Sequence, residues 1–509
     1  MRGERTSAWG RTTALSFGNA HAQAGHFPVP PGKGNVIELW SGHSSRSLLD
    51  RVRRSTAFAL SKMLYFLTCY LLSHPFVLAV VFAFIRRIRP IMVVGGNVIV
   101  TKHDDVKDVL ERFDDFTLAE YTESKMLGGP FLLSIDGRVR HTRERELLGS
   151  VVFPAHDERW IERLAADQCK ALIKRAMEDA PGPCEIDIAG GLAEAVALKI
   201  VGTYFGVTAV AAGKHEMARL LRRLAALILL EPPEGSKEWL AARKAILDLT
   251  EHLACLVKSR SAEVGRSPSA PLAGDDLLTR LVKSMHLSAG RPAWFNEDWI
   301  RRYLTGLAVF GNATVAQTAA HTIDQLLARP RALRRAQQAA RRLEGFRNAQ
   351  RRSSKAAAGD TDTGQRGRGE HEAVQRLRQF IYEALRFRPM LPLLARYSPR
   401  ETTLAKGTKR ARCVPAGARV IAGPLAAMFD PDVFERPWQF CSARPIEDYV
   451  HFGHGPHVCF GKYVADAQIV EIVRTVLLLP GLKRAPGRRG RVRYEGPAVD
   501  SLHVTFSPR

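Results

Sequence analysis

The stretch Phe452-Gly453-His454-Gly455-Pro456-His457-Val458-Cys459-Phe460-Gly461 decides how the chain is interpreted. It places one cysteine behind a glycine-punctuated turn and in front of a helical pattern. Gly453 and Gly455 can adopt positive φ, which brings backbone N–H groups close to the sulfur. The dipole of the helix that follows, from Lys462 to about Leu479, favours a thiolate at its N-terminus. The stretch therefore predicts a protected thiolate that can ligate a metal.

Two other interpretations of the same residues stay open at this point. The stretch could be a glycine-rich surface turn around a buried cysteine. Alternatively, His454, His457 and Cys459 could bind zinc, although no second ligand pair lies nearby in the sequence.

The stretch resembles the haem-binding loop of the cytochrome P-450 family, because every position of the pattern Phe-Gly-x-Gly-x-His-x-Cys-x-Gly is present. The resemblance implies that haem b (iron protoporphyrin IX) is the cofactor and that Cys459 is its axial iron ligand. It also implies that Phe452 shields the sulfur and that His457 donates to a haem carboxylate. Gly453 and Gly461 complete the cofactor-binding loop. Gly461 leaves room for the flat macrocycle.

A second pattern, Glu383-x-x-Arg386, lies about 75 residues before the cysteine. Glutamate and arginine at this spacing meet on one turn of a helix. The resemblance implies that Glu383 and Arg386 form a buried structural pair, with Arg444 as a third partner. The resemblance as a whole covers roughly residues 85–505. The implied fold is mostly α with small β-sheets (α+β), with haem between a long distal helix and the helix after the cysteine loop.

The long helical pattern over Trp299–Arg329 stands where this family has its distal helix. The resemblance places Thr314 beside the iron-bound oxygen. The acid expected just before that threonine is replaced by Ala313, while Asn312 and Gln317 are amides on an otherwise apolar helix. These two amides are candidate catalytic residues, or they only make contacts between helices.

Three basic residues outside the loop are candidates for binding the haem propionates. His141 and Arg145 lie four residues apart and share one helix face, which suits a dianionic ligand edge. Arg396 follows a predicted helix break and is a further candidate. His141 and Arg145 could equally form a solvated basic face.

The resemblance implies a monooxygenase that inserts one oxygen atom of O2 into an apolar small molecule such as a fatty acid or terpenoid. Its electrons would come from a ferredoxin or a flavoprotein, because the chain carries no flavin or iron–sulfur motif. The substrate pocket is expected around Phe131, Leu132 and Phe310.

Two alternatives to the monooxygenase stay open. The first is a peroxygenase or fatty-acid hydroperoxide isomerase of the same fold, which needs no electron donor and can carry amides in the distal helix. The second, of another class, is a haem-binding sensor without catalysis.

The charge and cysteine content narrow the choice of partners and compartment. The formal net charge is +24, from 75 Lys+Arg against 51 Asp+Glu. The arginines are spread along the chain without a nucleic-acid motif, so an acidic electron donor or an anionic membrane is favoured over nucleic acid. The seven cysteines show no pair spacing, which indicates a reducing compartment and a cytoplasmic protein.

The chain organisation follows from changes in composition. Residues 1–55 resemble a flexible basic arm, and 56–509 a single catalytic domain. Met63–Ile85 is long and uncharged, but it leads almost directly into a predicted hairpin around Gly95-Gly96-Asn97. We therefore expect a core helix or a peripheral membrane contact rather than a membrane span. A polar insert at about 346–371 is expected to be a disordered, dispensable loop.

Overall fold

The computed structural model describes residues 62–508, apart from 64, 119–128, 179–181, 211–212, 231, 267–275, 289, 357–362 and 497. Tertiary contacts separate Met1–Ser55 from Thr56–Arg509. The predicted flexible arm lies outside the described residues, and the description below concerns the second unit.

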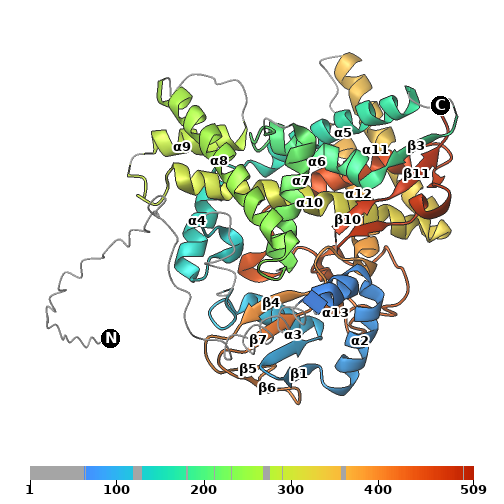
Figure 1. Ribbon diagram of the computed structural model, residues 1–509. Helices are drawn as coiled ribbons and strands as arrows, with labels where there is room; N and C mark the ends of the chain where they lie inside the picture. Colours follow the sequence, from blue (N-terminus) through green and yellow to red (C-terminus); the bar gives the residue numbers. More distant parts are fainter. Residues whose placement is uncertain are drawn as a thin grey trace, which may run out of the picture. The chain divides into compact units, whose positions relative to one another are not determined.

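Helices dominate this unit, in agreement with the fold class expected from the sequence (Figure 1). The α-helices are α2 (Pro75–Ile88), α3 (His103–Glu111), α4 (Arg138–Ser150), α5 (Pro154–Glu178), α6 (Glu194–Thr203), α7 (Lys214–Leu230), α8 (Lys237–Arg266), α9 (Leu277–Leu287), α10 (Glu297–Leu327), α11 (Pro330–Ala356), α12 (Thr363–Phe387), α13 (Pro424–Ala427) and α14 (Lys462–Leu477). A π-helical turn, η3 (Ile188–Ala193), leads directly into α6.

The strands form small sheets, as predicted. They are β1 (Ile91–Val94), β2 (Asn97–Val100), β3 (Cys184–Asp187), β4 (Leu394–Tyr397), β5 (Thr402–Leu404), β6 (Arg412–Val414), β7 (Arg419–Ala422), β8 (Lys483–Arg484), β9 (Arg493–Glu495), β10 (Ala498–Ser501) and β11 (His503–Phe506). Their orders are β1-β2-β7-β4, β3-β11-β8, β10-β9 and β5-β6. Pairing is antiparallel except between β2 and β7.

The four-stranded sheet separates two sets of side chains. Arg396 of β4 pairs in register with Val420 of β7, and Ala395 pairs with Ile421. Successive side chains along a strand point to opposite faces. Arg396 and Val420 therefore point to one face of the sheet, and Ala395 and Ile421 point to the other.

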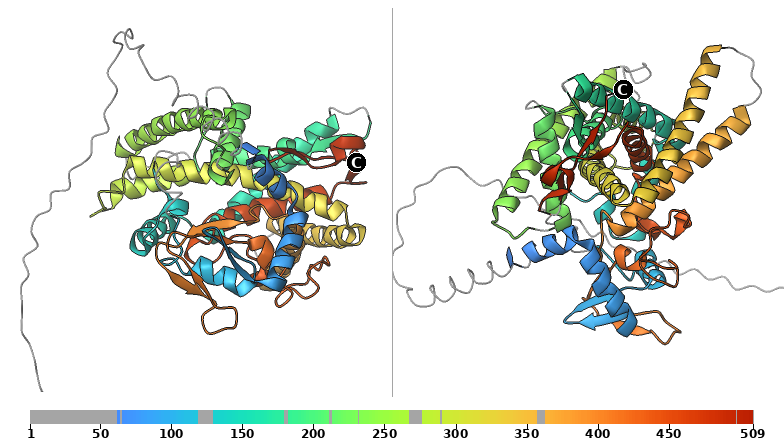
Figure 2. Two further views of the ribbon diagram at one scale, coloured as in Figure 1. Left: turned by 60° about the horizontal axis from the view of Figure 1, so that its bottom comes forward. Right: turned by 90° about the vertical axis from the view of Figure 1, so that its right-hand side faces the viewer.

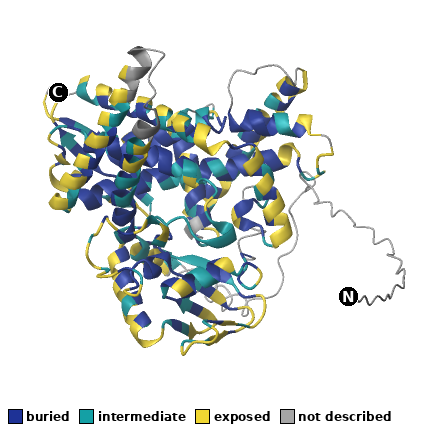
Figure 3. Cartoon of the chain, turned by 180° about the vertical axis from the view of Figure 1, so that it is seen from behind, coloured by how far each residue is buried: buried dark blue, intermediate teal, exposed yellow. Residues whose placement is uncertain are grey.

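The long helix α10 runs through the core. It packs against α6, α7, α8, α12 and α14. Figure 3 shows that many residues in the helical part of the molecule are buried. Its first half, including Trp299 and Val309, belongs to one apolar cluster. Its second half, including Val315 and Ile323, belongs to another. The segment with the unusual amides lies where these two clusters meet.

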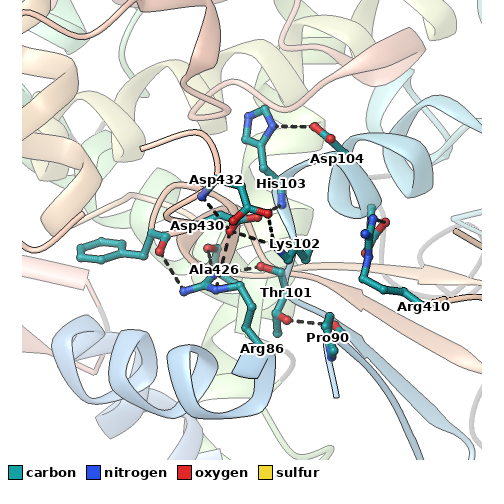
Figure 4. A network of polar contacts seen from close by, with 12 residues as sticks. Arg86, Pro90, Thr101, Lys102, His103, Asp104, Arg410, Ala426, Asp430 and Asp432 are labelled. Carbon is teal, nitrogen blue, oxygen red and sulfur yellow. Dashed lines mark hydrogen bonds and ion pairs between the residues drawn. The ribbon is translucent and has the colours of Figure 1, made fainter. Parts of the chain in front are cut away.

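A polar network fastens α2 to its neighbours (Figure 4). Arg86 donates to the carbonyl oxygens of Ala426 over 2.6 Å, Phe429 over 2.8 Å and Thr101 over 3.1 Å. The Asp430 carboxylate lies 3.9 Å from Arg86 Nε. Burial lowers the pKa of Arg86, and Asp430 acts against that shift. The α2 helix is therefore held by buried hydrogen bonds as well as by apolar packing.

The segment predicted as a core helix or peripheral contact, Met63–Ile85, is divided between two helices. Tyr65–Ser73 and α2 together have the length and composition of a membrane span, but they meet at an angle of 94°. Among the described residues, no single helix is long and apolar enough to cross a membrane.

The insert at about 346–371 differs from the expected disordered loop. The α11 helix continues to Ala356, α12 begins at Thr363, and the two helices run side by side (Figure 2). Residues 357–362 lie outside the described part. The prediction underrated the helix propensity of this Ala-, Arg- and Gln-rich segment. Phe346 also packs closely over Gly369, where a Cβ would come within 2.7 Å of its ring.

Candidate functional site

The cysteine loop is a turn built on two glycines with positive φ. Gly453 has φ 77° and Gly455 has φ 68°, values that other residues rarely adopt. A Cβ on Gly455 would lie 2.8 Å from the carbonyl oxygen of Leu110 in α3, so this site also needs glycine for close packing. The N–H of Cys459 closes the loop by donating to the Phe452 carbonyl over 2.8 Å.

The Cys459 thiol stands at the N-terminus of α14, where Gly461 is the N-cap residue. Its side chain is accessible, yet the surrounding protein raises the pKa of the thiol by desolvation. The Gly461 N–H and the Arg145 cation act in the opposite direction and favour the thiolate. A metal bound to this thiol would remove its proton outright.

Four basic side chains converge beside this loop. His141 and Arg145 come from α4, Arg396 from β4 and His457 from the loop, and we call these four residues the basic cradle. The ring centroids of His141 and His457 lie 4.4 Å apart. Burial, together with Arg396, His141 and Arg145, lowers the pKa of His457 to about 3. Burial and Arg145 lower the pKa of His141 to about 4. This arrangement attracts an anion.

The basic cradle contains a hydrogen-bonding atom without a partner. Within the described residues, His141 Nε2 is buried and makes no hydrogen bond. Leaving a buried polar atom unsatisfied costs about 1–3 kcal/mol, and an anionic oxygen would remove that cost. The residues present therefore fit the propionate edge of the haem that the sequence predicts.

The rival interpretations of the cysteine loop find less support. His454 points to Glu111, with 3.7 Å between Nε2 and a carboxylate oxygen. His457 stacks on Phe113 at 4.8 Å between ring centroids. In the part of the chain that the structure describes, no group of three or more His, Cys, Asp or Glu residues is arranged to hold a metal ion. The zinc site is therefore not formed.

The structure brings together the predicted structural pair. Arg386 donates from Nε and Nη2 to the two carboxylate oxygens of Glu383, each over 2.9 Å, and both side chains are fully buried. Arg444 Nε lies 3.7 Å from Glu383. The sequence did not indicate Tyr449 as a further partner, yet its hydroxyl donates to Glu383 over 2.8 Å.

The candidate residues of α10 point in different directions. Ala313 and Gln317 line a pocket, whereas the Thr314 hydroxyl donates to the Phe310 carbonyl over 2.6 Å. Asn312 is completely buried, and neither its amide nitrogen nor its amide oxygen has a hydrogen-bond partner among the described residues. The structure therefore does not place Asn312 beside Gln317 on the pocket wall.

The apolar residues expected in the substrate pocket lie elsewhere. Phe131 and Phe310 stack with 6.1 Å between ring centroids, and a Cβ on Gly306 would lie 2.3 Å from the Phe131 ring. Phe131 and Leu132 are buried in the apolar cluster around the first half of α10. They do not line the pocket described here, because tight packing against a glycine draws the Phe131 ring onto the helix.

The pocket itself has a volume of about 1230 Å³, including the part that opens to solvent. Its walls come from the segment before α2, from η3, α6, α7 and α10, from the loop Met390–Leu393 and from β4, β7 and β10. Most of its surface is apolar. Its largest polar groups belong to Gln317, Glu194, Arg222 and Arg419.

The family model described as Cytochrome P450 matches residues 95–491, which is more than half of the chain. The chain belongs to the cytochrome P450 family. The prediction from the cysteine loop is thereby confirmed at the level of the family, and with it an oxidoreductase of the haem-thiolate type.

Two fungal relatives match this cytochrome P450 over short segments. A "Bifunctional dioxygenase (DOX)-epoxy alcohol synthase (EAS)" of Fusarium oxysporum (strain Fo5176) is 33% identical over 91 residues, which are 18% of this chain and 7% of the relative. A "Linoleate diol synthase" of Gaeumannomyces graminis is 39% identical over 77 residues, which are 15% of this chain and 7% of the relative. The chain thus spans only a small part of these proteins.

The crystal structure of CYP109E1 from Bacillus megaterium in complex with testosterone has the same fold. It superposes with a TM-score of 0.63, at 19% sequence identity, and the match covers 84% of this chain and 96% of that one. At this level of identity the likeness speaks for the fold alone.

Sequence reasoning missed three charged residues of the pocket, namely Glu194, Arg222 and Arg419. They come from α6, α7 and β7, which are far apart along the chain. No motif joins them. Only the packing of these elements around α10 brings them to one cavity.

Proposed function

We propose that this cytochrome P450 rearranges hydroperoxides of long apolar molecules such as fatty acids, using an O–O bond that the substrate already carries. The main support for this proposal is that the part of α10 that lines the pocket presents Ala313 and Gln317 and no carboxyl group. The Thr314 hydroxyl is engaged with a backbone carbonyl. Activation of O2 requires protons and electrons from outside, whereas isomerisation of a hydroperoxide requires neither.

The fungal relatives support the same substrate class. Their printed names refer to an epoxy alcohol synthase and to a linoleate diol synthase. Both names refer to oxygenated products, and the second also names a fatty acid, linoleate. Because each match covers 7% of the relative's length, this chemistry is carried to the present chain as a proposal only.

Bound haem would supply the electron chemistry that breaks the O–O bond. The roles of the chain's own residues are distinct. Cys459 would hold the iron, and the basic cradle would hold the propionates. The apolar pocket wall, including Leu393 and Ile421, would take the hydrocarbon chain and exclude water. The amide of Gln317 would orient the hydroperoxide by a hydrogen bond.

A donor-free assay tests this function. Haem-loaded protein is mixed with a fatty-acid hydroperoxide without NAD(P)H or any electron donor. We expect conversion to products of the same mass. Gln317→Leu should lower kcat by about 10²-fold, in the range found when one orienting donor is removed. Gln338→Leu, at an exposed position of α11, should leave the rate unchanged. Absence of donor-free conversion would refute the proposal.

A second candidate is the monooxygenase that the sequence first suggested. Thr314 is present on the distal helix, and Arg138, Arg140 and Arg143 are exposed on α4 beside the basic cradle. This basic face would suit an acidic ferredoxin or flavoprotein. Oxidation that depends on NAD(P)H and a donor, without donor-free conversion, would favour this candidate. Haem binding without turnover under either condition would favour a sensor.

We also propose that the protein contacts a membrane peripherally. Large apolar side chains are exposed along the two helices that precede β1, namely Met63, Phe66, Leu67, Tyr70, Phe76, Val77, Val80, Val81, Phe84 and Ile88. Exposed Trp438 packs edge-on against Phe76. Thr68 and Leu72 of the same region line the pocket. A lipid surface would cover these side chains and lead an apolar substrate to the pocket.

A further inference from the structure

One carboxylate stands among the described residues that line the pocket. Glu194 is the first residue of α6 and follows η3 directly. The η3 turn is fixed by Asp187, whose carboxylate accepts the N–H groups of three successive residues. The Glu194 side chain is only 10% exposed. The backbone therefore presents this buried acid to the pocket from a rigid helix start.

Arg222 of α7 forms an ion pair with this acid. Its Nη1 lies 3.1 Å from one carboxylate oxygen of Glu194 and 3.3 Å from the other. Burial and the nearby Asp187 raise the pKa of Glu194, whereas Arg222 and His215 lower it. The net effect is a raised pKa, with burial as the largest cause. These opposing influences suit a group that gives and takes a proton. Both Glu194 and Arg222 line the pocket that Ala313 and Gln317 also line.

Asn312 of α10 lies near the same carboxylate. Its amide is near enough to lower the pKa of Glu194, although the two side chains do not meet in hydrogen-bond geometry. The amide is completely buried, and within the described residues its two polar atoms have no partner. A small movement that let the amide donate to Glu194 would satisfy it. Asn312 is thus suited to position the carboxylate, even though it does not line the pocket.

We propose that Glu194 is the proton-transfer residue of this pocket and takes the place of the acid that α10 lacks at Ala313. This rests on the proposed function. Glu194 accepts the proton of the hydroperoxide O–H group, and after the O–O bond has broken it returns that proton to the hydroxyl oxygen of the product. Substrate and product are isomers, so no atom or electron is gained or lost and no co-reactant is needed.

Four variants test the assignment with a linoleic acid hydroperoxide as the probe. Glu194→Gln should lower kcat by about 10²-fold or more, the contribution typical of a positioned acid–base group, and Glu194→Asp should restore much of it. Glu216→Gln is the matched control, because Glu216 of α7 pairs with Arg219 on its own helix and does not line the pocket. Arg222→Gln should raise the pKa of Glu194. All variants are compared at equal haem content.

The pH profile distinguishes proton transfer from a structural role. Activity should rise with pH as Glu194 ionises, and Arg222→Gln should move that rise to higher pH. The infrared band of the protonated Glu194 carboxyl, identified by its loss in Glu194→Gln, should titrate with the same shift. This second measurement does not need activity. An unchanged rate and pH profile in Glu194→Gln would overturn the inference, as would an unshifted carboxyl titration in Arg222→Gln.

A failure of the proposed function can be distinguished from a failure of the inference about Glu194. If the unaltered protein converts no hydroperoxide, the variants are assayed for O2-dependent oxidation with NAD(P)H and an electron donor. Glu194→Gln should then lower the product formed per NAD(P)H, because proton delivery to oxygen is still needed. Unchanged coupling would overturn the inference about Glu194 as well.

Discussion

Arg347 of α11 forms an ion pair with Glu471 of α14, whose carboxylate is fully buried. Arg347 also contacts Glu162 at 3.2 Å and Glu370 at 2.9 Å. Burial lowers the pKa of Arg347, but the carboxylates outweigh it and raise that pKa above its usual value. That the polar insert is dispensable stays a prediction, and a deletion of residues 347–369 would remove Arg347 from this network and leave its partner Glu370 without it.

Arg347→Ala should lower the free energy of unfolding by about 1–3 kcal/mol, the cost of leaving buried polar groups unpaired. The loss should stay in this range because Arg474 remains bonded to Glu471 over 2.8 Å. Urea denaturation measures it. Arg342→Ala is the control, since its pair with Glu372 is exposed and 4.0 Å long and is worth under about 1 kcal/mol. Equal stability of the two variants would contradict the network's role.

Cys459→Ala should abolish the thiolate-type, red-shifted absorption band of the ferrous carbonyl complex. The reason is that, among the described residues, Cys459 is the thiol that stands at the start of α14 beside the basic cradle. Cys441→Ala, at another accessible cysteine, should keep the band. Persistence of the band in Cys459→Ala would remove this residue as the axial ligand.

Glu383→Ala should destabilise the protein by about 3–5 kcal/mol, because it strands the fully buried Arg386 charge. We expect a low yield of soluble protein and little bound haem. Denaturant unfolding and pyridine-haemochrome content measure the two effects. Glu372→Ala, at an exposed position of the same helix, should change neither. Normal haem content in Glu383→Ala would show that the pair does not support the site.

The haem-free protein should lose stability as the pH falls from about 6.5, the unfolded pKa of histidine, towards the folded pKa of His141, which is about 4. In this pH range His141 is protonated in the unfolded chain but neutral in the folded protein. Protonation therefore favours unfolding. Melting temperatures across the window measure this. His141→Phe should flatten the slope, and bound haem should do so too, because an anion raises the pKa of His141. An identical slope in all three samples would exclude His141 as the cause.

Phe76→Ser and Phe84→Ser should each weaken binding to lipid vesicles, because each removes an exposed apolar side chain from the proposed membrane face. Burying such a side chain contributes about 1.5–3 kcal/mol. Co-sedimentation with vesicles of anionic and of neutral lipids measures the loss and shows how far the basic charge contributes. Leu247→Ser, which alters an exposed residue of α8, should bind as the unaltered protein does. Equal binding by all three variants would argue against this face.

Much of the site could be predicted from sequence because its geometry is local. The cysteine loop depends on glycines within a few residues of Cys459, and their positive φ values follow from the absence of Cβ. Glu383 and Arg386 meet because they lie one helical turn apart. The same spacing rule placed His141 and Arg145 on one face of α4. Each of these relationships is determined within a single element.

The tertiary structure decided everything that depends on how distant elements pack. The sequence marked Asn312 and Gln317 as unusual but could not tell which face of α10 would meet the cavity, and only Gln317 does. Phe131, expected in the pocket, packs on the helix instead. Glu194 and Arg222 carry no motif, because their ion pair exists only where α6 and α7 meet α10. Helical periodicity determines which residues share a face, whereas the packing of other elements determines what that face contacts.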